Sequence, residues 1–142
     1  MLSEESAIAS YRAAGKKITA QRMSVIRALV GNTGHPSAEA IYDRASKEIP
    51  SLSLKTVYAT LHELSDLRMI EALDLGTGSM RFDPNLGHHH HLVCEECGKT
   101  RDIDIDTSQL QLTGKKRQGF AVSSTEIIFR GTCEVCRENK AS

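Results

Sequence analysis

The first half of the chain repeats apolar side chains every three or four residues, the spacing that buries one face of an α-helix. A first helix is predicted over residues 4–14, and Gly15 ends it. Three more helices are predicted to begin at the N-cap residues Thr19, Ser37 and Ser53, whose hydroxyls can accept hydrogen bonds from unpaired amides. We therefore expect four helices before residue 70.

Two short strand-like runs follow the helices, over residues 71–75 and 79–83, and the turn Gly76-Thr77-Gly78 joins them. This pattern predicts a β-hairpin. Helices that close on a hairpin describe a winged helix-turn-helix, with the hairpin as its wing. Each element alone is common in proteins that bind no DNA, but their order favours a DNA-binding function.

The periodicity changes after residue 83. Strands are predicted over residues 89–94 and 100–106, a modest helix over residues 107–118, and a longer strand over residues 120–133. The long strand has an apolar face, Val122 and Ile127 to Phe129, that a module of this size has little else to cover. We therefore expect it to pack against a second copy and form a homodimer.

These elements predict an α+β fold in two parts: a winged helix-turn-helix followed by a small αβ dimerisation domain. The expected DNA-binding domain is residues 1–83, a hinge of Pro, Asn and Gly residues is 84–87, and the dimerisation domain is 88–142.

Composition adds little beyond one local bias. Hydrophobic side chains make up 39% of the 142 residues, which is enough to form hydrophobic cores. The net charge is zero and gives no indication of binding to nucleic acid or membrane. Residues 12–38, however, hold five Lys or Arg and no Asp or Glu, which is either a DNA-facing surface or an ordinary solvated helix face. The N-terminus is neither a signal peptide nor a membrane span, so we expect a cytoplasmic protein.

All four cysteines fall into two C-x-x-C pairs, Cys94 with Cys97 and Cys133 with Cys136. One such turn can direct only two sulfurs at an ion, so two turns together predict a structural zinc site with four thiolate ligands. In a reducing compartment these pairs are better interpreted as ligands than as disulfides.

The run His88 to His91 needs a separate interpretation, because four thiolates already complete the coordination of zinc. On a strand, His89 and His91 share one face, while His88 and His90 share the other. Such a pair can begin a second metal site, although a solvated polar run is the plainer alternative. Two ligands are too few, so the rest of the chain must supply others.

The order of motifs resembles the ferric uptake regulator (Fur) family of metal-responsive repressors over nearly the whole chain. The matching segments are ITAQR at 18–22, HPSAEAIY at 35–42, SLKTVYATL at 53–61, RFD at 81–83, and HHHHLVCEECGKTRDID followed by C-x-x-C. The resemblance implies a winged helix joined to a dimerisation domain, with a regulatory ion between them. Its implied ligands are His35, Asp83, His89, His91 and Asp102.

Three imidazoles and two carboxylates suit Fe(II) or Mn(II), and the absence of thiolate argues against copper. The resemblance also favours the peroxide-sensing (PerR-like) branch, because that branch has aspartate where Asp102 stands and iron-sensing members usually have glutamate. A further site that many iron-sensing members contain is not matched, so His88 and His90 receive no assigned site.

We therefore hypothesise a repressor, not an enzyme, that binds a roughly palindromic DNA operator when metal holds its domains together. The resemblance implies that peroxide oxidises His35 or His89 when Fe(II) is bound, which releases metal and DNA. Lys17, Arg22, Lys55 and Arg81 are candidates for phosphate contacts, and Thr56 and Tyr58 for base contacts. An iron-level repressor and, more distantly, a non-haem iron enzyme remain as alternatives.

Overall fold

A computed structural model describes residues 1–86 and 89–141. Gly87, the end of the expected hinge, and His88 lie outside the described residues. The chain divides into two compact units, residues 1–87 (unit 1) and 88–142 (unit 2). None of the described helices is long and apolar enough to cross a membrane.

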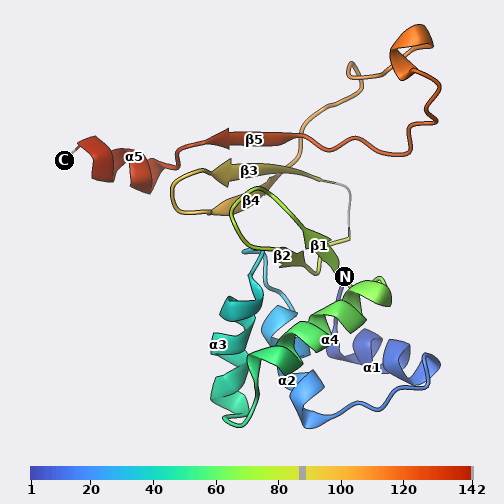
Figure 1. Ribbon diagram of the computed structural model, residues 1–142, viewed down its shortest axis with the longest axis vertical. Coiled ribbons are helices and arrows are strands. Elements are labelled where there is room, and N and C mark those ends of the chain that lie inside the picture. Colours follow the sequence, from blue (N-terminus) through green and yellow to red (C-terminus); the bar gives the residue numbers. More distant parts are fainter. Residues whose placement is uncertain (87–88, 142) are drawn as a thin grey trace. The chain divides into compact units, whose positions relative to one another are not determined.

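Unit 1 begins with four helices and ends in a two-stranded hairpin (Figure 1). The helices are α1 (Glu4–Ala13), α2 (Ala20–Leu29), α3 (Ala38–Glu48) and α4 (Leu54–Asp66), and the hairpin strands are β1 (Glu71–Leu73) and β2 (Arg81–Asp83). All three predicted N-caps form: the hydroxyls of Thr19, Ser37 and Ser53 each accept a hydrogen bond from the amide three residues on. The hydroxyl caps satisfy amides that have no partner inside the helix.

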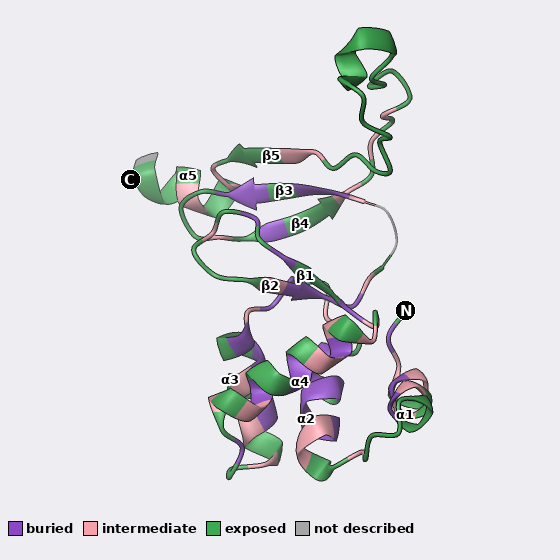
Figure 2. Ribbon diagram, turned by 45° about the vertical axis from the view of Figure 1, so that its right-hand side comes forward, coloured by how far each residue is buried: buried purple, intermediate pink, exposed green. Residues whose placement is uncertain are grey.

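The core of unit 1 lies where α2, α3 and α4 meet, and their inward faces are buried (Figure 2). Ile26, Ile41 and Leu61 have no exposed surface, and α1 adds Tyr11, which is also fully buried. The hairpin is antiparallel, with Ala72 opposite Phe82, and Phe82 closes the core from that side. The predicted winged helix-turn-helix is confirmed.

Unit 2 is built on a three-stranded sheet in the order β4-β3-β5 (Figure 1). The central strand β3 (His90–Cys94) pairs antiparallel with β4 (Thr100–Ile103) and parallel with β5 (Ile128–Gly131). A C-terminal helix, α5 (Glu134–Ala141), follows; it is short and mostly polar, and it was not predicted. The α+β class and the two-part architecture are confirmed.

Two predictions in unit 2 are wrong. The helix expected over residues 107–118 is reduced to a single 3₁₀ turn, Gly114–Arg117, and the strand expected over residues 120–133 pairs only at β5. Gly114 has a φ of 58° and Gln118 a φ of 48°, both left-handed and outside helical values. Within the described chain, residues 108–126 are all exposed, so no packing stabilises a helix or extends the strand (Figure 2).

Candidate metal centres and DNA-reading helix

The four cysteine thiols meet in unit 2 although they come from two distant segments. Cys94 ends β3 and Cys97 lies in the turn after it, whereas Cys133 follows β5 and Cys136 is on α5. The four sulfur atoms all lie within 4.8 Å of one another, and those of Cys97 and Cys133 are 3.8 Å apart. Four Zn–S bonds of about 2.3 Å in a tetrahedron place the sulfurs about 3.8 Å apart. The cluster therefore fits zinc.

Backbone amides already favour the ligand form of one thiol. The Cys133 amide donates to the Cys94 sulfur at 3.3 Å, and this bond, with that from the Cys97 amide, lowers the pKa of Cys94 to about 6. By contrast, the hydrogen bond with Cys133 and then burial raise the pKa of Cys136 to about 12. Four thiolates within 4.8 Å of one another would repel, and a bound cation would offset that repulsion.

In unit 1, His35 and Asp83 form a buried pair at the base of the wing. The imidazole Nε2 lies 3.0 Å from a carboxylate oxygen, and the two side chains are 0% and 2% exposed. The chain holds His35 at a φ of 51°, which is uncommon for a residue with a Cβ. Two hydrogen bonds to β2 support this conformation: Arg81 donates to the His35 carbonyl at 3.2 Å, and the Phe82 amide donates to the Pro36 carbonyl at 2.9 Å.

In unit 2, His89, His91 and Asp102 form a second cluster, on one face of the sheet. The strand register places His91 directly opposite Asp102, and His89 precedes His91 by two residues. One Asp102 oxygen lies 3.1 Å from Nε2 of His89 and 3.5 Å from Nε2 of His91. The rings of the two histidines are 4.8 Å apart. The alternation predicted from the sequence therefore brings three potential ligands to one place.

Two more side chains near this cluster have defined contacts, Glu126 and His90. Glu126, which was not among the predicted site residues, places a carboxylate oxygen 3.1 Å from Nδ1 of His91, on the side of the ring away from Nε2. His90 points elsewhere and accepts a hydrogen bond from the Ile127 amide at 3.0 Å, which helps to join β3 to β5. His90 therefore has a structural hydrogen bond, whereas Glu126 lies next to a predicted metal ligand. No local motif marks Glu126, because it is 35 residues from His91 in the sequence.

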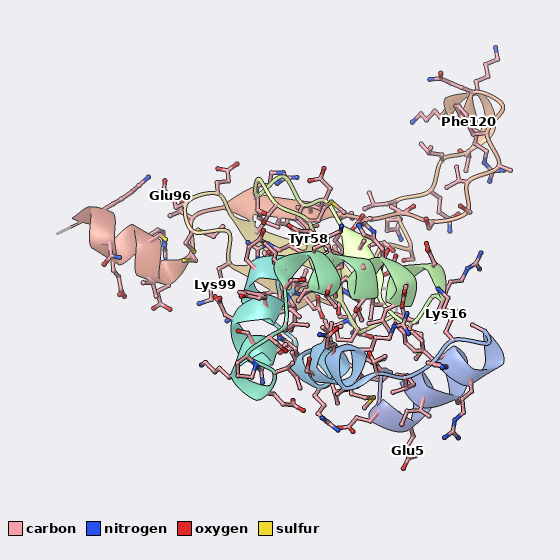
Figure 3. The ribbon with its side chains drawn as sticks, turned by 60° about the horizontal axis from the view of Figure 1, so that its bottom comes forward. Glu5, Lys16, Tyr58, Glu96, Lys99 and Phe120 are labelled. Carbon is pink, nitrogen blue, oxygen red and sulfur yellow. The ribbon has the colours of Figure 1, made fainter. Side chains whose placement is uncertain are left out.

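The residues predicted to contact DNA come from several parts of unit 1: Lys17 precedes α2, Arg22 is on α2, Arg81 begins β2, and the other three are on α4. Lys17 and Lys55 are exposed, and Thr56 hydrogen-bonds the capping Ser53 through its hydroxyl at 2.9 Å. Tyr58 is 36% exposed on α4 and donates a hydrogen bond to Glu39 at 2.8 Å (Figure 3). These positions keep the hydroxyls and amines at a surface.

The other two predicted phosphate contacts already have protein partners. Arg22 donates to Glu63 at 3.0 Å and to the Lys17 carbonyl, and its guanidinium lies 5.3 Å from the centre of the Tyr11 ring. Arg81 is held by the His35 carbonyl. Their positions assign both arginines a structural role, and contact with DNA stays a prediction for each.

Comparison with known proteins identifies what the chain is similar to. The model of the ferric uptake regulator family matches residues 13–130. The peroxide-responsive repressor PerR of Staphylococcus aureus (strain USA300) is 33% identical over 135 residues, covering 94% of this chain and 91% of the relative.

Solved structures of two proteins from this family also resemble the chain. The Helicobacter pylori ferric uptake regulator Fur, described as having three functional metal-binding sites, superposes with a TM-score of 0.78 at 22% identity, over 94% of this chain and 90% of that one. PerR from Streptococcus pyogenes, described as a peroxide sensor and gene regulator, is 31% identical with a TM-score of 0.54, over 93% of this chain and 91% of that one.

Proposed function

Because the chain belongs to the ferric uptake regulator family, we propose that it is a metal-dependent DNA-binding repressor that responds to hydrogen peroxide. The family consists of metal-responsive transcriptional regulators, so the chain is a regulator and not an enzyme. Its cofactors are structural zinc and a regulatory ion, Fe(II) or Mn(II).

The observation that carries this proposal is the division of the regulatory ligands between the units. Unit 1 supplies one imidazole and one carboxylate, His35 and Asp83, which are both buried. Unit 2 supplies two imidazoles and one carboxylate, from His89, His91 and Asp102. Neither set alone completes the five or six ligands that Fe(II) and Mn(II) commonly take, but the two sets together offer five.

A shared ion would make the relative orientation of the units depend on metal. Ligands from both units can bind one ion in only one arrangement, so metal selects that arrangement from the others. In unit 1, Asp83 is the last residue of β2, its carboxylate lies beside His35, and Arg81 ties β2 to the His35 loop. Metal binding would thus constrain the wing and, through the shared core, α4. We propose that this arrangement is the DNA-binding form.

The donor set supports a peroxide response. Nitrogen and carboxylate ligands without thiolate suit Fe(II), which when bound supplies the reducing equivalents for peroxide. His35 and His89 are the proposed sites of oxidation, and an oxidised imidazole would be a weaker ligand. Asp102 in place of glutamate, together with the 33% identity to a peroxide-responsive repressor, favours peroxide over iron level as the signal.

The proposed repressor is a homodimer that binds a roughly palindromic operator. One face of the unit 2 sheet leaves Leu92 and Phe129 42% and 46% exposed beside a hollow of about 380 Å³. Residues 108–126 expose further apolar side chains, including Phe120 at 73%, and Phe120 lies well away from the sheet (Figure 3). Apolar surface of this extent supports association with a second copy. Two copies of α4 would then read successive major grooves.

Binding to a randomised DNA library by the purified dimer, with Fe(II), with Mn(II) and without added metal, tests the first part of the proposal. We expect enrichment of one sequence only with metal, and an affinity that falls as salt rises. Peroxide should then abolish binding by the iron form and leave the manganese form unchanged. Mass spectrometry of the iron form should find added oxygen on peptides that contain His35 or His89.

Two results would contradict the proposal at different levels. If no metal supports sequence-selective binding, the chain is not a metal-dependent repressor of this kind. If binding requires metal but the iron form survives peroxide with both histidines unmodified, the regulator detects metal level and not peroxide. Asp43→Asn, which alters an exposed carboxylate on α3, serves as a control that should behave as wild type in the metal and peroxide steps.

A further inference from the structure

The hydrogen bond between Tyr58 and Glu39 joins the surface of α4 to the start of α3. The Tyr58 hydroxyl donates to a Glu39 carboxylate oxygen at 2.8 Å, and both side chains are exposed. Glu39 is in the first turn of α3, the helix that Ser37 caps. The contact therefore fixes the direction of one hydroxyl on the helix proposed to read DNA.

The direction of this hydrogen bond determines what the pair can offer to a ligand. A tyrosine hydroxyl can donate one hydrogen bond, and here the Glu39 carboxylate accepts it. The phenolic oxygen is left with lone pairs, and an ionised carboxylate can only accept. Toward solvent, Tyr58 and Glu39 thus present acceptors and no donor.

The protonation states agree with this description. The hydrogen bond from Tyr58 lowers the pKa of Glu39, and the same bond raises the pKa of Tyr58. At neutral pH the carboxylate is therefore ionised and the phenol keeps its proton.

Only two base edges in the major groove can donate to such a pair. Adenine presents its N6 amino group there and cytosine its N4 amino group, whereas guanine presents two acceptors and thymine an acceptor and a methyl group. An acceptor-only pair would leave the guanine or thymine acceptors opposed by lone pairs and a negative charge. We infer that Tyr58, oriented by Glu39, selects an exocyclic amino group, on adenine or cytosine, at one position of each operator half.

This inference rests on the proposed function, because it names the base chemistry that the proposed reading helix recognises. Tyr58 would be the contacting residue, and Glu39 a positioning residue that fixes the hydroxyl proton. The surrounding exposed side chains on α4, Lys55 and His62, are separate from this hydrogen bond. Loss of the carboxylate should therefore change which base is preferred and leave general phosphate binding in place.

The experiment begins with selection from a randomised duplex library by the metal-loaded wild-type dimer, Tyr58→Phe and Glu39→Ala. We expect wild type to enrich adenine or cytosine at one position per operator half, and both variants to lose that preference there alone. Affinity is then measured on duplexes in which that base is replaced by its analogue without the amino group, purine for adenine or 2-pyrimidinone for cytosine. Removal of the amino group should weaken wild type about tenfold and Tyr58→Phe by less than about twofold.

Two controls separate this role from simpler ones. Tyr42→Phe makes the same chemical change on α3, and Asp43→Asn removes an exposed carboxylate one turn from Glu39 on the same helix. Both should keep the wild-type preference. If Asp43→Asn weakened the base preference at the same operator position as Glu39→Ala, the loss of negative charge, and not the fixed hydroxyl, would account for the effect. That result would overturn the inference.

The outcomes distinguish the inference from the proposed function. If wild type selects a sequence but Tyr58→Phe changes no position, or changes one occupied by guanine or thymine, the inference is overturned and the repressor proposal stands. Equal weakening of wild type and Tyr58→Phe by the amino-free analogue would overturn it as well. If wild type selects no sequence with any metal, the proposed function fails and the inference fails with it.

Discussion

The contact network of Glu63 should make the stability of unit 1 depend on one carboxylate. Glu63 on α4 accepts hydrogen bonds from Tyr11 on α1 and from Arg22 on α2, each at 3.0 Å. Its side chain is 22% exposed and that of Arg22 is 25% exposed, so solvent screens the pair only in part. Each hydrogen bond to a charged group contributes roughly 1.5–3 kcal/mol when buried. After a discount for screening, we expect Glu63→Gln to lower the free energy of unfolding by about 1–2 kcal/mol.

The loss should depend on pH in a defined direction. Burial alone would raise the pKa of Glu63, but the hydrogen bonds from Arg22 and Tyr11 and the positive charges of Arg22 and Lys16 together lower it. A pKa lowered by folding means that the stabilisation is complete above the unfolded value of about 4.3 and disappears as pH falls through the folded value. The difference in the free energy of unfolding between wild type and Glu63→Gln should therefore be constant from pH 6 to 8, where Glu63 is ionised in both the folded and the unfolded protein. This difference should shrink below pH 4.

Urea unfolding followed by tyrosine fluorescence measures this effect in the intact protein. All three tyrosines lie in unit 1 and the chain has no tryptophan, so the signal reports unit 1 and is insensitive to loss of zinc from unit 2. Glu71→Gln, at an exposed position in β1, is the matched control and should change stability by less than about 0.5 kcal/mol. A loss for Glu63→Gln no larger than the control, or equally large at pH 3 and pH 7, would refute the reasoning.

Three further predictions concern the metal clusters. Cys97→Ser should release zinc and unfold unit 2 while unit 1 keeps its tyrosine signal, as followed by zinc content and circular dichroism; a folded, zinc-free unit 2 would contradict it. Glu126→Gln should weaken Mn(II) binding about tenfold in a titration followed by electron paramagnetic resonance, because outer carboxylates orient ligand imidazoles, whereas Glu134→Gln should not. Asp102→Glu should slow peroxide-dependent release of DNA by the iron form and leave metal-dependent binding intact; an unchanged rate would argue against the peroxide-sensing assignment.

Local signals account for most of what could be predicted in unit 1. Thr19, Ser37 and Ser53 cap the helices that they were expected to cap, because an N-cap needs only an amide two or three residues away. The apolar stripe of α4 buries Val57, Leu61 and Leu64 for the same reason, since spacing alone puts them on one face.

Spacing was also enough for two parts of the metal clusters. The C-x-x-C turns predicted a four-cysteine cluster because all the cysteines of the chain are in them, and alternation along β3 predicted that His89 and His91 share a face. The role of the complete ligand set, including His35, Asp83 and Asp102, stays a prediction that came from the family resemblance.

Tertiary structure decided what depends on partners distant in the sequence. Residues 107–118 have a weak helical pattern, but no packing partner in the described chain covers it, and a short helix without one is marginal. No pattern in the sequence predicts four other features. These are the parallel pairing of β5 with β3, the positive φ of His35, the hydrogen bond from Arg22 to Glu63 and the approach of Glu126 to His91. The sequence by itself determined the helices, the hairpin and the cysteine cluster, because these follow from neighbours a few residues apart. Only the folded chain decided that Arg22 pairs with Glu63 and that Glu126 lies beside His91, because these contacts join residues 41 and 35 positions apart.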